Sequence, residues 1–155
     1  MRWWTGLLAV TVLLATLPVG SALGAAKAQK LTITLREMSF TPARVTLQAG
    51  TKTQITLLNK GKVKHEFMVY DTPAGKMDES EMHAWAEEHS YFKGVEVEVE
   101  GGGIAVEGEE IFEVEVGPGR SAELTFTPRR TGTFEMGCMV EGHYEQGMKG
   151  VVVVK

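Results

Sequence analysis

The sequence predicts an all-β protein, an antiparallel sandwich or barrel of short strands. Apolar and polar residues alternate over residues 31–35 and 44–48, as in strands with one buried face. Glycine and proline separate such segments, and no regular strand–helix alternation indicates a parallel α/β fold. Further strands are predicted at residues 51–58, 65–70, 121–127, 133–136 and 151–154.

The middle of the chain, about residues 73–116, departs from this pattern. A helix is predicted at residues 77–93, because Asp78 can cap it and Glu81 follows three positions later. One stripe of this helix carries Met82, Trp85, Ala86 and His89. Residues 95–100 and 111–116 then alternate on either side of a turn at the glycines 101–103, which predicts a hairpin. We therefore expect a helix-plus-hairpin insertion in one domain.

The insertion is strongly acidic. We expect its carboxylates to form a solvated face, with docking of a partner as the alternative. They are Glu98, Glu100, Glu107, Glu109, Glu110, Glu113 and Glu115.

The N-terminus resembles a secretory signal. Arg2 precedes an uncharged apolar stretch, residues 5–19, and the small residues Ala22 and Gly24 then offer a cleavage site. We predict a signal peptide at residues 1–24 and a single domain at residues 25–155, located in the periplasm or elsewhere outside the cytoplasm. An uncleaved membrane anchor is the alternative, although the stretch is shorter than the roughly 20 residues that span a bilayer.

Charge and cysteine content narrow the function. The net charge is −4 and there is no run of lysines and arginines, which excludes nucleic acid as an expected partner. Exported proteins usually carry paired cysteines, but this chain has only Cys138. A lone thiol in an oxidising compartment needs burial, a partner chain or a metal.

The metal is favoured by the residues that follow Cys138. His143 and Met148 complete a Cys-x4-His-x4-Met spacing in a glycine-containing segment between two predicted strands. A thiolate, an imidazole and a thioether favour a soft, redox-active metal, and two histidines, one cysteine and a weak methionine ligand are diagnostic of blue copper. His65 begins a predicted strand and is the best candidate for the second histidine. We therefore predict a copper site formed by these residues.

These residues resemble the cupredoxin family, which includes plastocyanin, azurin and auracyanin. Asn59-x-Gly61-x3-His65 and the loop from Cys138 to Met148 carry the resemblance, together with Phe40-Thr-Pro42 and Ala49-Gly50. It covers roughly residues 31–72 and 117–155. It implies a Greek-key β-sandwich that binds one copper ion, which shuttles between Cu(I) and Cu(II).

The resemblance also implies a role for each site residue. Cys138 would supply the short thiolate bond, His65 and His143 would complete the trigonal plane, and Met148 would be the axial ligand. His143 would lie at the solvent edge, beside an apolar entry port for electrons. Backbone N–H groups near Glu66 and Val140 would donate hydrogen bonds to the sulfur.

Glu66 stands where azurin and plastocyanin usually have asparagine. An ionised carboxylate near the metal would stabilise Cu(II) and lower the reduction potential, whereas a buried one could be protonated.

The predicted function is one-electron transfer without substrate turnover, by a monomer that exchanges electrons with a redox protein such as a cytochrome or an oxidase. The alternative is a copper-tolerance or copper-delivery protein, which Glu66, the surplus methionines and the insertion favour. A hydrolase built on Cys138 and His143 is a poor alternative because no orienting Asp or Asn is evident. A structural zinc site is also poor, since zinc rarely recruits methionine.

Simpler interpretations remain for single residues. Cys138 could be a buried structural thiol, Met148 a core side chain, and His65 a hydrogen-bonded histidine at a strand end. Packing is the favoured role of Met68, Met136 and Met139. A second copper site could use Met77, Met82, His83 and His89, although packing explains Met82 and His89 better.

Overall fold

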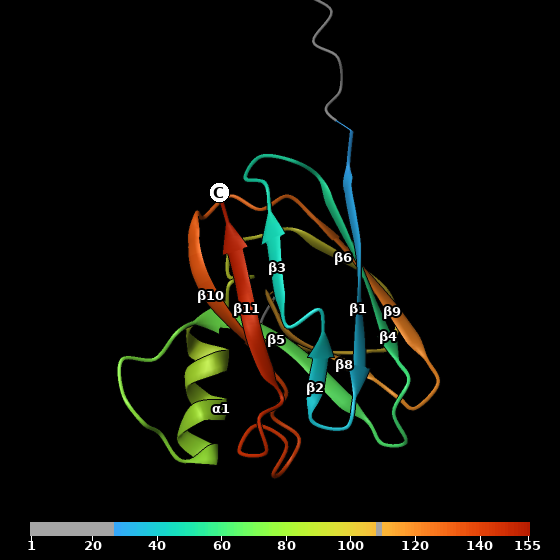
Figure 1. Ribbon diagram of the computed structural model, residues 1–155. Helices are drawn as coiled ribbons and strands as arrows, with labels where there is room; N and C mark the ends of the chain where they lie inside the picture. Colours follow the sequence, from blue (N-terminus) through green and yellow to red (C-terminus); the bar gives the residue numbers. More distant parts are fainter. Residues whose placement is uncertain (1–26, 108–109) are drawn as a thin grey trace, which may run out of the picture.

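The computed structural model describes residues 27–107 and 110–155, and it forms a two-layer β-sandwich with one short helix (Figure 1). The predicted signal peptide, residues 1–24, lies outside the described residues. Sheet one contains, in spatial order, β2 (Ser39–Thr41), β1 (Gln29–Arg36), β4 (Thr53–Asn59), β9 (Ser121–Phe126) and β6 (Val97–Gly101). Sheet two contains β3 (Arg44–Leu47), β11 (Lys149–Val154), β10 (Gly132–Gly137), β5 (His65–Asp71), β8 (Glu110–Val116) and β7 (Gly103–Glu107).

The core fills the space between the two sheets, as the alternating sequence pattern requires. Along β4, every second side chain from Thr53 to Asn59 is buried. Fully buried side chains of this core include Ile33, Leu35, Leu47, Ile55, Leu57, Phe67, Phe92 and Leu124. The all-β prediction is therefore confirmed. Most strand pairs are antiparallel, but β1–β4 and β3–β11 are parallel, which local patterning does not predict.

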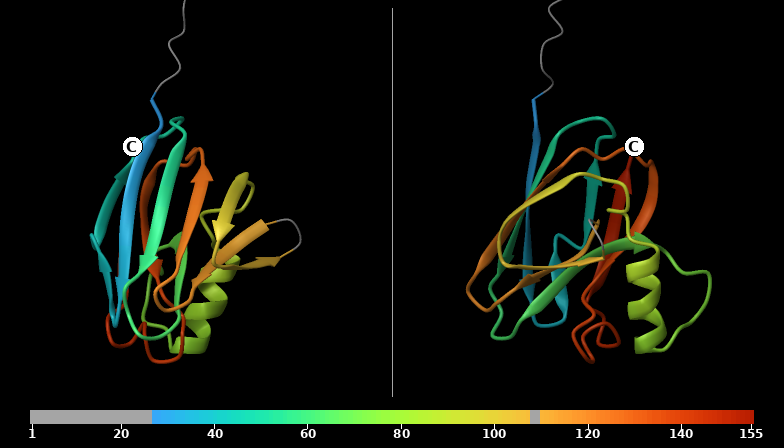
Figure 2. Two further views of the ribbon diagram at one scale, coloured as in Figure 1. Left: turned by 90° about the vertical axis from the view of Figure 1, so that its right-hand side faces the viewer. Right: turned by 180° about the vertical axis from the view of Figure 1, so that it is seen from behind.

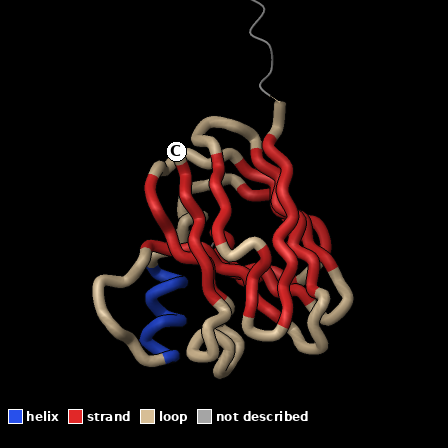
Figure 3. The backbone as a smooth tube through the Cα atoms, viewed as in Figure 1, coloured by secondary structure: helices blue, strands red, loops and turns tan. Residues whose placement is uncertain are grey.

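The middle segment completes the sandwich instead of standing apart from it. The predicted hairpin between residues 95–100 and 111–116 is wrong in its pairing, because β8 pairs with β7 on one side and with β5 on the other, in sheet two. In contrast, β6 pairs with β9 in sheet one, so the glycines at 101–103 cross from one sheet to the other. Helix α1 (Glu79–Glu88) covers the outer face of sheet two (Figures 2 and 3).

The helix is shorter than predicted. Its N-terminus is capped as expected, because the Asp78 side chain accepts a hydrogen bond from Glu81 N at 2.9 Å and Asp78 N donates one to Glu81 Oε2 at 3.0 Å. However, it ends at Glu88 rather than residue 93, because Tyr91 and Phe92 turn into the main core. There both rings pack edge-to-face against Phe126.

The prediction of a solvated acidic face is only partly correct. Glu98 and Glu100 on β6 are exposed, but Glu113 on β8 is only 6% exposed. The side chains of Glu107 and Glu109 lie outside the described residues. Among the residues that the structure describes, no helix is long and apolar enough to cross a membrane.

Candidate metal centre

The predicted ligand loop is the connection of a β-hairpin. β10 and β11 are antiparallel, and their last pair, Gly137–Lys149, leaves residues 138–148 as the loop. The loop is folded on itself, since Cys138 N donates to Met148 O at 3.2 Å and Met148 N donates to His143 O at 3.0 Å. These bonds place the backbones of all three predicted ligands within one compact turn.

The pairing of β5 with β10 brings His65 to this loop. Met68 lies opposite Gly137 at the end of the β5–β10 ladder, so the residues before Met68 run alongside the start of the loop. Glu66 N lies there and donates a hydrogen bond to Cys138 Sγ at 3.3 Å. His65, one residue earlier, is paired with Val116 of β8.

Asn59 fixes the turn that leads into His65. It is fully buried, and its Nδ2 donates to Val63 O at 2.8 Å and to Val116 O at 2.7 Å. Its Oδ1 accepts a hydrogen bond from Gly61 N at 2.8 Å. In the sequence, Asn59 belongs to the motif that carries the family resemblance, and the structure shows that it joins this turn to β8.

Three of the predicted ligands converge. One potential ligand atom from each of His65, Cys138 and His143 lies within 4.8 Å of the others, and all three residues are buried. Cys138 Sγ lies 3.3 Å from His143 Nδ1, and the two imidazole rings are 5.1 Å apart between centroids. Met148 is also fully buried, in the same hydrophobic cluster as Cys138. This cluster is typical of a type 1 copper site.

The donor atoms fit a metal better than they fit a metal-free interior. Both ring nitrogens of His65 are buried and without a hydrogen-bond partner, which is costly unless a metal satisfies one of them. Burial lowers the pKa of His65, His143 lowers it further, and Glu37 raises it, so the net shift favours the neutral imidazole that metals bind.

Burial raises the pKa of the Cys138 thiol to about 11, although backbone N–H groups of Glu66 and Val140 lower it. A metal therefore has to displace a proton from the sulfur.

Two carboxylates outside the loop hold it in place, and sequence reasoning identified neither. Glu135 Oε1 accepts hydrogen bonds from Tyr70 Oη at 3.0 Å and from Tyr144 Oη at 2.7 Å, which ties the residue after His143 to sheet two. Glu79, in the first turn of α1, accepts a hydrogen bond from Gly142 N. The helix of the insertion thus contacts the residue before His143.

Glu37 and Gly61 lie against the outer side of His65. Glu37 accepts a hydrogen bond from Lys62 N, and its charge raises the pKa of His65. A Cβ atom at Gly61 would lie 2.9 Å from His65 Nε2 and 2.8 Å from Glu37 Oε1. Only glycine fits this gap without displacing the imidazole.

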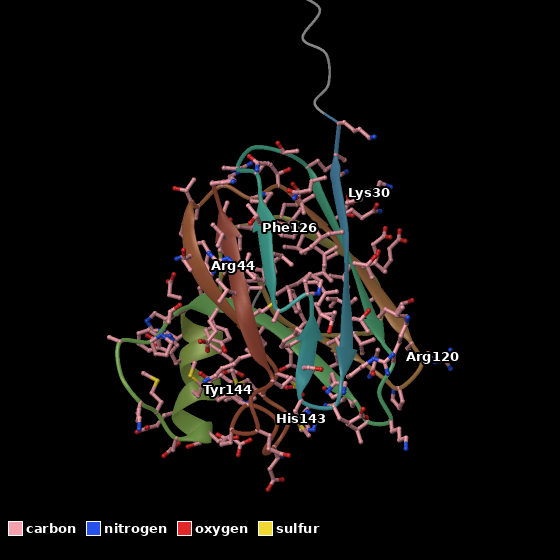
Figure 4. All side chains as sticks on the ribbon, in the orientation of Figure 1. Lys30, Arg44, Arg120, Phe126, His143 and Tyr144 are labelled. Atoms are coloured by element: carbon pink, nitrogen blue, oxygen red, sulfur yellow. The ribbon has the colours of Figure 1, made fainter. Side chains whose placement is uncertain are left out.

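The residues beside His143 in the loop are mostly polar, and the apolar entry port stays a prediction. His143 is 7% exposed, and its loop neighbours Glu141, Glu145 and Gln146 are exposed. Among the described residues, Val63 is the one large hydrophobic side chain classed as exposed. Figure 4 places His143 and Tyr144 at the end of the molecule formed by the loop.

Comparison with known proteins agrees with this geometry. The profile of the cupredoxin-like domain matches residues 6–88, more than half of the chain and including His65. The chain belongs to the cupredoxin family. The profile stops before the loop that carries Cys138, His143 and Met148, so the geometry supports these three independently.

Two proteins with similar sequences are named copper-resistant cuproproteins. The copper-resistant cuproprotein CopI of Rubrivivax gelatinosus is 30% identical over 140 residues, covering 89% of this chain and 74% of the relative. CopI of Pseudomonas aeruginosa is 28% identical over 146 residues, covering 86% and 80%. Among solved structures, reduced auracyanin from Roseiflexus castenholzii has a TM-score of 0.57 at 23% identity, covering 83% of this chain and 98% of that one. This last similarity establishes a shared cupredoxin fold.

The Glu66 side chain does not point into the sandwich core. β5 is buried on both faces: His65 and Phe67 face the core, whereas Glu66 lies on the outer face of sheet two. There one carboxylate oxygen of Glu66, Glu113 and Glu115 each lies within 4.8 Å of the others, and Lys64 Nζ lies 3.2 Å from Glu66 Oε1.

The residues considered for a second copper site do not gather as a set. Met82 is a buried residue of α1 that packs in one cluster with Met68 and Met139, which confirms their packing role. The His89 ring stacks on Trp85 with 3.5 Å between centroids. His83 faces Glu87 and Glu113 instead.

Gly61→Ala should weaken copper binding about tenfold or more, because the new methyl group displaces the His65 imidazole. Cu(II) affinity measured by competition with a chelator checks this. Gly75→Ala is the matched control, since a Cβ there meets nothing within 4 Å. Equal affinities in the two variants would contradict the packing argument.

Glu113 should make the metal-free protein less stable as pH rises. Burial, followed by the charges of Glu66 and Glu115, raises the pKa of Glu113 from 4.5 to about 7, against the opposing charge of Lys64; Glu87 also raises it. Between these two values the folded state binds more protons, so the free energy of unfolding falls with pH, by up to about 1.4 kcal/mol per pH unit.

Glu113→Gln should remove this contribution, so the stability difference between the variant and the parent should grow in favour of the variant from pH 5 to 8. Chemical denaturation at several pH values measures it, with the exposed Glu98→Gln as control. A difference that is constant with pH would contradict the prediction.

Proposed function

We propose that this cupredoxin is an exported copper-resistance protein that binds one copper ion through His65, Cys138, His143 and Met148. The observation that carries the proposal is the similarity to two CopI proteins over most of the chain, at 30% and 28% identity. The N-terminal sequence pattern supports export.

The ligand residues divide the work of holding the metal. The imidazoles of His65 and His143 and the sulfur of Cys138 would bind it directly, and the buried thioether of Met148 would complete the set. The N–H of Glu66 stabilises the thiolate form of Cys138. When bound, copper supplies one-electron redox chemistry between Cu(I) and Cu(II).

The polar end of the molecule bears on the choice between resistance and electron transfer. An electron carrier of the predicted kind would present an apolar patch over His143, but this surface carries Glu141 and Glu145. We propose that a partner docking here is basic, so that its charge complements these carboxylates. A one-electron carrier is the second candidate, because the buried ligand cluster also suits reversible electron exchange.

The metal assignment predicts an intense absorption band at about 600 nm in the Cu(II) form. Cys138→Ser should abolish the band, because it arises from the Cu–thiolate bond. Met148→Leu should keep copper bound and raise the reduction potential, since a weak axial donor is lost. A copper-loaded protein without the band would rule out a type 1 site, and loss of copper in the Met148 variant would contradict the axial role.

The resistance role predicts that deleting the gene in its host lowers the copper concentration that the cells tolerate. The parent chain and the Gly75→Ala control should restore tolerance, whereas Cys138→Ser should not. Growth curves across a copper series measure this. Unchanged tolerance combined with slower respiratory or photosynthetic electron flow would favour the carrier instead.

A further inference from the structure

The outer face of sheet two contains a charge conflict that the type 1 site does not explain. Glu66 and Glu115 lie directly opposite each other in the β5–β8 ladder, and Glu113 shares the same face two residues along β8. Like charges at such positions destabilise a sheet, and burial increases the cost. Glu66 and Glu113 are nevertheless each only 6% exposed.

Lys64 pairs with only some of the carboxylate oxygens in this cluster. Its ammonium group contacts Glu66 Oε1 and Glu115 Oε1, and its side chain is 47% exposed, so it lies on the solvent side. The Glu66 side chain is only 8% exposed, and its other oxygen, Oε2, is buried and has no hydrogen-bond partner. A buried carboxylate oxygen without a hydrogen-bond partner is costly, so this position favours a bound cation.

A histidine from the helix faces one of these carboxylates, that of Glu113. His83 Nε2 lies 3.8 Å from Glu113 Oε2 and 3.3 Å from Glu87 Oε1, and this nitrogen is buried without a hydrogen bond. Glu113 is therefore the link between the Glu66 and Glu115 carboxylates on one side and His83 on the other.

We propose that the converging carboxylates of Glu66, Glu113 and Glu115, with His83 facing Glu113 from the helix, form a second metal site that takes Cu(II). One imidazole nitrogen and several carboxylate oxygens form a donor set of the borderline-to-hard kind, which suits Cu(II) rather than Cu(I). Cu(II) is also the first-row divalent ion that such donors bind most strongly. The site differs chemically from the buried thiolate site, since it contains no sulfur.

The second site would adjoin the first. Glu66 follows His65 in β5, and its backbone N–H donates to Cys138 Sγ while its carboxylate faces the opposite side of the sheet. The raised pKa of Glu113 is consistent with the proposal, because crowded carboxylates that hold a proton near neutral pH exchange it for a cation. The proposal does not depend on a role in copper resistance.

The test uses tag-free protein whose type 1 site is already filled with Cu(II), to which one further equivalent of Cu(II) is added. The second ion should give an electron paramagnetic resonance signal of ordinary, non-blue copper with nitrogen coupling. His83→Gln and Glu113→Gln should each weaken this second binding about tenfold or more. His89→Gln, a histidine on the same side of the molecule but outside the cluster, should leave it unchanged.

The absorption band at about 600 nm serves as the internal control, because it reports on the type 1 site and the fold independently of the second site. An intact band with second-site binding that is the same in parent, His83→Gln and Glu113→Gln proteins would overturn the proposal and indicate an adventitious ion only. Absence of any second signal in the parent protein would also overturn it. Neither result would bear on copper binding at Cys138.

Discussion

The burial of β5 on both faces is the constraint on which the rest of the molecule depends. A strand with one face to solvent could present His65 to the metal loop, but its other face would stay wet. Here α1 covers that face, and Met68 and Tyr70 are buried as fully as Phe67. Glu66 and Glu113 are buried on the same face. The ligand loop has two supports outside it, Glu79 from α1 and Glu135 from β10.

The sequence predicted those features that depend on local pattern or on the chemistry of single residues. Alternation identified nearly every strand, and the Asp78–Glu81 pair identified the helix start, because both signals act over a few residues. The spacing of Cys138, His143 and Met148 carried the ligand chemistry, since one hairpin loop delivers all three.

The features that the sequence missed depend on contacts between distant segments. Tyr91 and Phe92 end the helix because a core made of β9 and β10 accepts their rings. Glu79 meets Gly142 across 63 residues, and Glu37 meets Lys62 across 25. The prediction that the acidic residues are solvated was wrong for Glu113, because nothing local reveals that α1 covers it.

The ligand loop is supported by parts of the chain that do not belong to it. Glu79 binds its backbone from the helix, Glu135 binds Tyr144 from β10, and Lys149 Nζ lies 4.4 Å from the centre of the Tyr144 ring. For protein engineers, this means that residues 138–148 are not an exchangeable module. A loop transplanted into or out of this scaffold would lose its anchors, so loop exchange among cupredoxins would have to carry the covering helix as well.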